Sequence, residues 1–254
     1  MKLTKISLKG RPRWVEIDKQ NNHYLLHGQN PTEGLTRGKR LNQHILKQAK
    51  FENLFWGRNI VGLALNYRSL VGKKTRYDEP LIFLKSFNSI CPHQSRITYP
   101  RQLDTVWVEV ELVIIIAKKC RRVSPAKAHQ YIYGYTIGSD ITAKNIADRD
   151  WHLARSKALD QFAPLGPWIL KDLDTSNLKI ATHINNKQYQ QDNTANRILN
   201  DAQSVSLVSQ FITLMPGDLI FTGTPSGATD SLVKSGDKVN HTIENIGQLS
   251  FTIR

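Results

Sequence analysis

The stretch Val106-Trp-Val-Glu-Val-Glu-Leu-Val-Ile-Ile-Ile116 carries two acidic side chains inside an apolar run that is typical of a β-strand. Side chains of a strand alternate between its two faces, so Glu109 and Glu111 are predicted to point the same way, alongside Trp107 and Val113. Two ionised carboxylates in an apolar strand repel each other and lose hydration unless a positive charge lies between them. A hard divalent cation such as Mg²⁺ or Mn²⁺ meets that need because it prefers oxygen ligands.

A Glu-x-Glu pair alone also fits an exposed edge strand with two solvated glutamates, and residues further along the chain favour the metal site. Asp140 ends a predicted strand about thirty residues after Glu111, which allows a third carboxylate to converge on the pair. Lys157 follows seventeen residues later. A lysine beside a metal–carboxylate centre can stabilise a substrate oxyanion or transfer a proton. The small, hydroxyl-rich turn at 222–227 offers backbone N–H groups to an anionic oxygen.

The composition is that of an ordinary soluble globular protein. The chain has 254 residues, 40% of them apolar and 22% charged, which suits one large domain or one domain with a small appendage. No apolar run approaches the roughly 20 residues of a membrane helix. The formal net charge is +14, but the basic residues are scattered and no nucleic-acid-binding motif accompanies them. We therefore expect neither membrane nor nucleic acid as a partner, and we assign the charge to the attraction of small anionic substrates.

The N-terminus and the cysteines predict the compartment. The first ten residues alternate in strand fashion and lack the apolar core of a signal peptide. Cys91 and Cys120 have no CxxC spacing and are too few for a disulfide framework, so they are expected to be free thiols. Both features favour a cytoplasmic protein.

Residues 1–55 are predicted to form a small N-terminal β unit, and residues 56–254 a larger catalytic domain. In the N-terminal unit, segments 14–18 and 23–27 alternate as a hairpin, and a polar loop with Pro31 and Gly34 follows.

The larger region is predicted to be rich in strands. The expected strands are 60–65, 81–84, 135–140, 179–184 with a second strand after the turn at 185–186, 219–222, 238–243 and 249–253. Helices are expected over 124–133, which opens with Ser and Pro, and over 204–214. Strands and helices do not alternate regularly, which disfavours a Rossmann or (β/α)₈ architecture and favours a β-rich α+β fold.

Nine segments in one order across residues 56–254 resemble the fumarylacetoacetate hydrolase family. They are Ile60-Val-Gly-Leu-Ala-Leu-Asn-Tyr-Arg68, Pro80-Leu-Ile-Phe-Leu-Lys85, Val108-Glu-Val-Glu-Leu-Val113, Gly134-Tyr-Thr-Ile-Gly-Ser-Asp-Ile-Thr-Ala143, Ser156-Lys157 with Asp160, Leu165-Gly-Pro-Trp168, Gln190 with Asn193-Thr194, Thr213-Leu-Met-Pro-Gly-Asp218 and Thr222-Gly-Thr-Pro225. Single pieces such as the last are weak signals, whereas nine in order are specific. The branch that the chain resembles contains 2-hydroxyhepta-2,4-diene-1,7-dioate isomerases and acylpyruvases.

The resemblance implies a mixed β-sandwich roll that is usually a homodimer, with Mg²⁺ or Mn²⁺ held by Glu109, Glu111 and Asp140. It also implies a small anionic 2-oxo or enol carboxylate as substrate, with Lys157 stabilising an enolate and Thr224 anchoring a carboxylate. The further site residues carried over from the matched segments are Lys144 as a second catalytic residue, and Gly223, Arg68 and Gln190 as substrate-binding residues. Negative charge on an oxygen beside a Lewis-acidic metal is the shared feature of the family's reactions.

Departures from the family pattern concern the activation of water. Leu70 stands where many members carry the histidine of a His–Glu pair on a mobile lid, and Lys144-Asn145 replaces Arg-Asp. His93 and His152 are the alternative bases, because the pKa of a histidine suits proton transfer wherever it lies in reach. His129 and His183 are expected to be structural, as are Asp160, Gly217 and Asp218.

The segment 68–79 is predicted to be a lid that lacks a proton acceptor for water and offers cations to a distal carboxylate, through residues such as Lys73, Lys74 and Arg76. We therefore expect isomerase or decarboxylase chemistry on a dienedioate-like acid of aromatic catabolism, ahead of C–C hydrolysis of acylpyruvates or fumarylpyruvate. A third possibility is a family member that has lost turnover and serves as a binding subunit.

Overall fold

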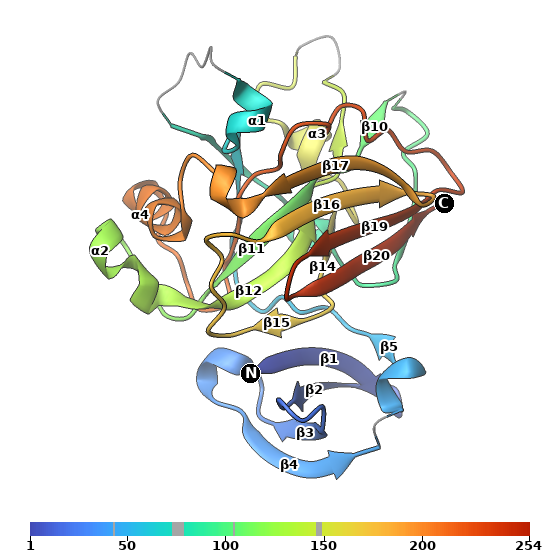
Figure 1. Ribbon diagram of the computed structural model, residues 1–254, viewed down its shortest axis with the longest axis vertical. Helices are drawn as coiled ribbons and strands as arrows, with labels where there is room; N and C mark the ends of the chain where they lie inside the picture. Colours follow the sequence, from blue (N-terminus) through green and yellow to red (C-terminus); the bar gives the residue numbers. More distant parts are fainter. Residues whose placement is uncertain (43, 73–78, 104, 146–148) are drawn as a thin grey trace.

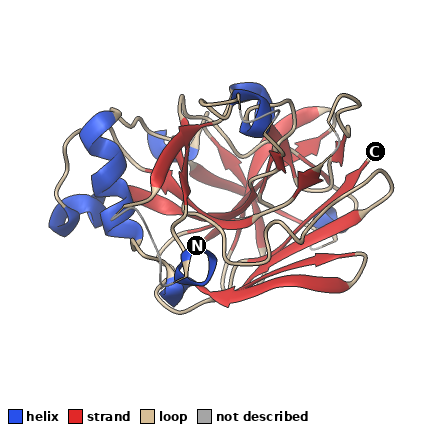
Figure 2. Cartoon of the chain, turned by 90° about the horizontal axis from the view of Figure 1, so that it is seen from above, coloured by secondary structure: helices blue, strands red, loops and turns tan. Residues whose placement is uncertain are grey.

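The computed structural model describes residues 1–254 with the exception of 43, 73–78, 104 and 146–148. Strands dominate and the helices are short, which confirms the β-rich α+β class predicted from the sequence (Figure 1). Figure 2 shows the strands running through the body of the molecule, with most of the helical turns at its periphery. No helix in the described part of the chain is long and apolar enough to cross a membrane.

The N-terminal strands occupy the lower part of Figure 1. They are β1 (Lys2–Leu8), β2 (Arg11–Ile17), β3 (His23–His27), β4 (Thr36–Leu41) and β5 (Lys50–Phe51). The predicted hairpin is present, since β2 and β3 pair in antiparallel fashion. The polar loop with Pro31 and Gly34 follows, as expected, and β4, which was not predicted, comes after it. Among the described residues β4 pairs with β3 alone, at the end of the sheet, and its sequence shows no apolar alternation.

The N-terminal strands are joined to the rest by backbone pairing. β1 pairs with β15 (Ile169–Leu170), placing Leu3 opposite Ile169, and Thr4 Oγ1 donates to Pro167 O at 2.8 Å. The division of the chain after residue 55 stays a prediction.

The larger sheet continues from β15 in the order β12, β11, β18, β6, β7. Its strands are β6 (Ile60–Ala64), β7 (Leu81–Leu84), β11 (Val110–Ile116), β12 (Ile132–Ser139) and β18 (Leu219–Phe221). Every residue of β11 is buried, as its β-branched, apolar composition requires of a central strand.

A second sheet covers β11 and β12 in the order β17, β16, β19, β20, β9 (Figure 1). Its strands are β9 (Arg96–Ile97), β16 (Lys179–Ile184), β17 (Lys187–Asn193), β19 (Lys238–Ile243) and β20 (Gly247–Ile253). Alternate residues of β16 and β19 are buried, and Ile180 and Val239 join Leu112 and Ile137 in one apolar core. Val113 and Ile115, on the other face of β11, belong to a separate apolar cluster, and the acidic side chains described below share that face.

The remaining described elements are short. They are β8 (Ile90–Pro92), β10 (Val106–Trp107), β13 (Thr142–Ala143), β14 (Ala163–Leu165), α1 (Arg68–Val71), α2 (Pro125–Ala128), α3 (Ala154–Lys157), α4 (Asp201–Phe211) and 3₁₀ turns at Pro31–Glu33, Ile45–Lys47, Phe87–Ser89, His129–Tyr131 and Thr194–Asn196.

Two predicted helix ranges were wrong at their ends. The helix expected over 124–133 ends as α2 and a 3₁₀ turn, because the chain from Ile132 pairs with β11. The helix expected over 204–214 is α4, which begins three residues earlier because Asn200 and Gln203 form a capping box.

The strand expected over 106–116 is interrupted. Val108 and Glu109 separate β10 from β11, and the Val108 N–H donates to Ser231 O at 3.1 Å instead of joining a regular ladder. Glu109 O accepts from the Asp140 N–H at 2.9 Å, so the break leaves this residue tied to the end of β12.

Candidate metal centre

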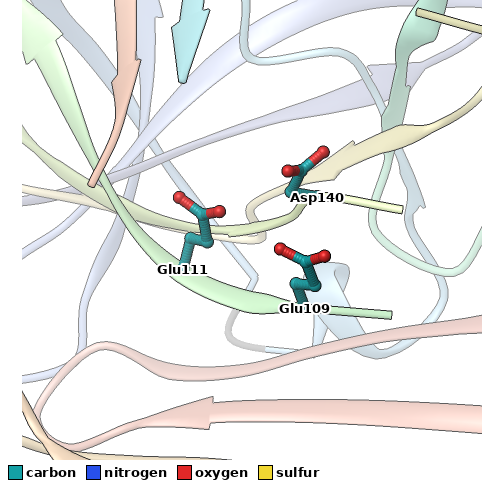
Figure 3. A group of neighbouring side chains, drawn as sticks. All are labelled: Glu109, Glu111 and Asp140. Atoms are coloured by element: carbon teal, nitrogen blue, oxygen red, sulfur yellow. The ribbon is translucent and has the colours of Figure 1, made fainter. Parts of the chain in front are cut away.

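Three carboxylates meet on the face of β11 that points away from the second sheet, the face that Val113 and Ile115 share. Glu109, Glu111 and Asp140 each offer an oxygen, and these oxygens lie within 4.8 Å of one another. Figure 3 shows the two glutamates rising on one side of the same stretch of chain, with Asp140 reaching them from a separate segment. All three residues are buried, with Asp140 fully shielded from solvent.

Strand pairing explains why these residues converge. Val110, between the two glutamates, lies opposite Ser139, the residue before Asp140. The three acids therefore come from adjacent strands at one level of the sheet, and the Glu-x-Glu spacing puts both glutamates on one face.

Two buried lysines accompany the acids. Lys157 Nζ donates to Asp140 Oδ2 and, at 2.8 Å, to Thr142 Oγ1, and it lies 3.5 Å from both carboxylate oxygens of Glu109. Lys85 Nζ donates to the other Asp140 oxygen at 2.5 Å, with no exposed side-chain surface. The Lys157 ammonium also lies 4.7 Å from the ring centre of Phe83. Both cations therefore bind Asp140.

Glu109 and Glu111 are held by further donors. Glu109 Oε1 accepts from Trp107 Nε1 at 2.6 Å and from Thr142 Oγ1 at 2.9 Å. Glu111 Oε2 accepts from the Gly223 N–H at 2.6 Å. Within the described residues, Glu111 forms no ion pair with a lysine or arginine. One of the three carboxylates thus lacks a direct cationic partner.

Burial affects the pKa values of the two glutamates and the two lysines. It raises the pKa of Glu111 well above the ordinary value, and the Asp140 and Glu109 carboxylates add to that rise. Burial also raises the pKa of Glu109, against the opposing effect of Lys157. Burial lowers the pKa of Lys85. For Lys157 burial acts in the same direction, but Asp140 and Glu109 outweigh it, and its pKa lies above the usual value.

This donor set fits a divalent cation. Three buried carboxylates are offset by two lysine charges, which leaves an excess of negative charge when all the groups are ionised. All the candidate ligand atoms are carboxylate oxygens, the type that Mg²⁺ and Mn²⁺ prefer. A cation near Glu111 would offset the repulsion that raises the pKa of its carboxyl group.

Gly223 and Gln190 connect the turn after β18 to the centre. Gly223 has φ +90°, and a Cβ there would lie 2.8 Å from both Leu63 O and Asn66 Cβ, so only glycine fits. Gln190 Oε1 accepts from the Val110 N–H at 3.3 Å, and Gln190 Nε2 donates to Thr224 Oγ1 at 2.9 Å.

Other predicted site residues lie apart from the carboxylates. Arg68 and Lys144 are exposed, and among the described residues neither side chain bonds to the three acids. Leu70 lies in α1 and is half-buried. Lys73, Lys74 and Arg76 of the predicted lid lie outside the described residues.

The two histidines considered as alternative bases have other surroundings. His93 Nδ1 accepts from the Ser250 N–H at 3.0 Å, and its ring packs edge-on against Phe51. Burial lowers the pKa of His93 to about 4. His152 is exposed, and the described residues include no hydrogen-bond partner for its ring. Neither histidine contacts the acidic cluster in the described part of the chain.

Lys85 is the residue of this cluster that sequence reasoning missed. It ends the matched segment Pro80-Leu-Ile-Phe-Leu-Lys85, directly after β7. A lysine at the end of an apolar strand usually reaches solvent, so its burial against Asp140 depends on tertiary contacts. The position of Lys85 within a matched segment was the available signal.

Fold and site together define a β-rich protein with a buried centre of three carboxylates and two lysines. Residues 57–254 match the family described as "Fumarylacetoacetate (FAA) hydrolase C-terminal". The chain belongs to the fumarylacetoacetate hydrolase family.

Three relatives illustrate the similarity. The 4-hydroxyphenylacetate degradation bifunctional isomerase/decarboxylase of Salmonella dublin is 34% identical over 211 residues, covering 79% of this chain and 49% of that protein. The crystal structure of 5-carboxymethyl-2-hydroxymuconate delta-isomerase from Mycobacterium smegmatis has a TM-score of 0.88 at 30% identity, covering 100% of this chain and 99% of that one. Fumarylpyruvate hydrolase of Pseudomonas aeruginosa, in complex with Mn²⁺ and pyruvate, has a TM-score of 0.72 at 27% identity, covering 78% and 90%.

Proposed function

We propose that this protein is a Mg²⁺- or Mn²⁺-dependent enzyme acting on a small 2-oxo or 2-hydroxy-enoic acid that carries a second carboxylate. Isomerase or decarboxylase chemistry is favoured. The observation that carries the proposal is the buried cluster of Glu109, Glu111 and Asp140 with Lys157 beside it. The Mn²⁺ and pyruvate bound to the Pseudomonas relative support the same class of cofactor and ligand.

The three carboxylates would hold the metal, and a metal bound there would act as a Lewis acid toward the 2-oxo group of the substrate. Lys157 would contribute a fixed positive charge. Its raised pKa keeps it protonated at neutral pH, and Asp140 and Thr142 hold its Nζ in place. A preorganised cation stabilises negative charge on a substrate oxygen without reorganisation during the reaction.

Isomerisation and decarboxylation are favoured over hydrolysis because hydrolysis needs a base that activates water. Leu70 has no proton-accepting group, His93 is held by Ser250, and His152 is exposed. Moving a proton within an enol acid, or releasing carbon dioxide from it, needs charge stabilisation but no attacking water. The Mycobacterium isomerase and the Salmonella isomerase/decarboxylase support this order of preference.

C–C hydrolysis of acylpyruvates or fumarylpyruvate is the alternative, supported by the Pseudomonas hydrolase. A further alternative is a binding subunit without turnover. Two observations support it: Lys144 is exposed, and Leu70 stands where many family members carry a histidine.

The deciding experiment tests oxaloacetate, acetylpyruvate, fumarylpyruvate and a 2-hydroxy-dienedioate with Mg²⁺ or Mn²⁺, following each product separately. We expect isomerisation or decarboxylation that chelation abolishes. Glu111→Gln should abolish the activity together with metal binding, whereas Glu244→Gln, at an exposed acid, should retain both. Fast acylpyruvate hydrolysis would support the alternative enzyme, and metal binding without any turnover would support the binding subunit.

A further inference from the structure

A line of five buried polar side chains connects the two sheets beside the metal centre. Their exposed fractions do not exceed 4%. They are Ser139 at the end of β12, His241 in β19, Thr182 in β16, Gln190 in β17 and Thr224 in the turn after β18. Apolar packing requires none of them there, so each must find hydrogen-bond partners inside the protein.

Consecutive members are in hydrogen-bonding contact. Ser139 Oγ lies 2.8 Å from His241 Nε2, and His241 Nδ1 lies 2.9 Å from Thr182 Oγ1. Thr182 Oγ1 lies 2.7 Å from Gln190 Oε1, and Gln190 Nε2 lies 2.9 Å from Thr224 Oγ1. The line is therefore continuous from β12 to the turn.

Backbone groups at Gln190 set the direction of the whole line. Its Oε1 faces the Val110 N–H, and its Nε2 faces Pro225 O at 3.0 Å. A backbone N–H can only donate and a carbonyl oxygen can only accept. If the Gln190 amide were flipped, its NH₂ group would face the Val110 N–H and its oxygen would face Pro225 O, so this orientation is fixed.

The remaining protons follow from that orientation. Thr182 must donate its single hydroxyl proton to Gln190 Oε1, so it must accept from His241 Nδ1–H. Burial lowers the pKa of His241 to about 3, so the ring is neutral and carries one proton. With that proton on Nδ1, Nε2 accepts from the Ser139 hydroxyl.

At the other end, Thr224 Oγ1 accepts from Gln190 Nε2, which leaves the proton of its own hydroxyl to be donated elsewhere. In the described part of the chain Thr224 Oγ1 makes no other hydrogen bond. Its neighbour Gly223 donates to Glu111, so this free donor lies at the edge of the acidic cluster.

We propose that His241 is a positioning residue that acts through Thr182 and Gln190 to make the Thr224 hydroxyl a fixed donor for a carboxylate oxygen of the substrate. The inference deepens the proposed function and rests on it. The same line contacts the metal centre at two other points. Ser139 precedes Asp140, and Gln190 accepts from Val110, which lies between the two glutamates. A histidine without contact to the acids is thus linked by hydrogen bonds to the anion site.

The first test reads the tautomer of His241. Long-range ¹H–¹⁵N correlation spectra of the metal-free wild-type protein, with the signal assigned by loss in His241→Asn, distinguish a protonated from an unprotonated ring nitrogen. We expect the neutral Nδ1–H form. In the neutral Nε2–H form Thr182 would donate to His241 and have no proton left for Gln190 Oε1, and this result would overturn the inference whether or not the protein is an enzyme.

The second test measures anion binding separately from stability. Oxalate is the probe, because it presents two adjacent carboxylates to a Mn²⁺-loaded protein and does not react. Titration calorimetry should show oxalate affinity about fivefold weaker in Thr182→Val and within about twofold of wild type in Thr182→Ser, with Mn²⁺ affinity unchanged in both. The matched control is Thr242→Val, which removes a hydroxyl from the opposite face of the neighbouring strand, beside His241.

The outcomes separate the two proposals. Lower thermal stability of Thr182→Val with wild-type oxalate affinity would make the line merely structural and overturn the inference. Wild-type protein that binds neither Mn²⁺ nor oxalate would overturn the proposed function itself, while the tautomer experiment would still decide the direction of the line.

Discussion

At the scale of single residues, burial strengthens the electrostatic interactions of the acidic and basic side chains in the metal centre. Asp140 has no exposed surface and is bound by two lysine ammonium groups. Removing either partner of such a pair leaves a charge that water cannot reach. Lys157 also contacts Glu109 and Thr142, whereas the hydrogen bonds of the Lys85 ammonium to described residues go to Asp140 and the nearby Ile141 carbonyl. Lys157 is therefore the better candidate for chemistry, and Lys85 for positioning.

Lys157→Met tests that assignment. We expect turnover of the substrate found in the panel to fall by about 10²–10³-fold, the scale of losing one oxyanion donor. Mn²⁺ affinity should fall little, because the candidate ligands are the three carboxylates. Steady-state kinetics and calorimetry measure the two quantities, with Lys19→Met as an exposed control. Wild-type turnover in Lys157→Met would remove this lysine from the mechanism.

Glu111 makes stability depend on pH in the metal-free protein. Its folded-state pKa lies above the ordinary value of 4.5, so the folded state binds more protons than the unfolded chain above that pH. The contribution of Glu111 to the unfolding free energy therefore falls as pH rises toward its folded-state pKa. Urea unfolding in chelator between about pH 5 and pH 8 should show this loss in the wild type and a flatter profile in Glu111→Gln. A steeper profile in the variant would contradict the assignment. Added Mn²⁺ should reduce the loss, because it replaces the protons.

At the scale of elements, alternation of apolar and polar residues predicted most strands that pack on a core. This pattern did not reveal β4, which lies at the edge of the sheet. The predicted start of α4 was also wrong, because a capping box extends the helix. At the start of β18, a buried side chain that binds backbone N–H groups holds the chain in place. Asp218 precedes this strand and is fully buried, with Oδ1 accepting from the N–H groups of Arg58 and Asn59 at 2.6 and 2.8 Å.

Asp218→Asn should therefore lower stability without touching the centre. Asp218 Oδ2 accepts from Asn59 Nδ2 at 2.6 Å and from the Met215 N–H at 2.8 Å, so each carboxylate oxygen faces two donors. In Asp218→Asn an NH₂ group would replace one of these oxygens. It would point at two N–H donors and could not accept a hydrogen bond from either. We expect a loss of about 1–3 kcal/mol of unfolding free energy in urea titrations. Asp230→Asn, at an exposed acid, is the control, and equal stabilities would refute the argument.

At the scale of the whole molecule, exposed apolar side chains lie along the end of the larger sheet. β7 is the last strand of the sheet path, and Leu81, Leu84 and Phe87 are 44%, 53% and 67% exposed. Contiguous apolar surface on an edge strand is a common site of association between chains. These residues are consistent with the homodimer that the family resemblance predicts.

Light scattering after size-exclusion chromatography tests the oligomeric state. We expect a dimer with twice the 28.9 kDa mass of the chain at micromolar concentration. A Leu84→Lys and Phe87→Lys double variant should shift the equilibrium toward monomer, whereas Lys substitution at the exposed Phe211 of α4 should not. A monomeric wild type would contradict the prediction.

The β-rich class, most strand positions and the spacing that puts Glu109 and Glu111 on one face could be predicted without a structure. These properties depend on residues close together in the chain, whose period of two is legible without a structure. Nine ordered segments also led to the family. Tertiary structure alone decided what surrounds that face. Lys85 pairs with Asp140 across 55 positions of sequence, and His241 reaches Ser139 across 102. Such partners are brought together by tertiary packing, within one sheet for Lys85 and between two sheets for His241. Burial then sets their charge and hydrogen-bond direction, which no local pattern encodes.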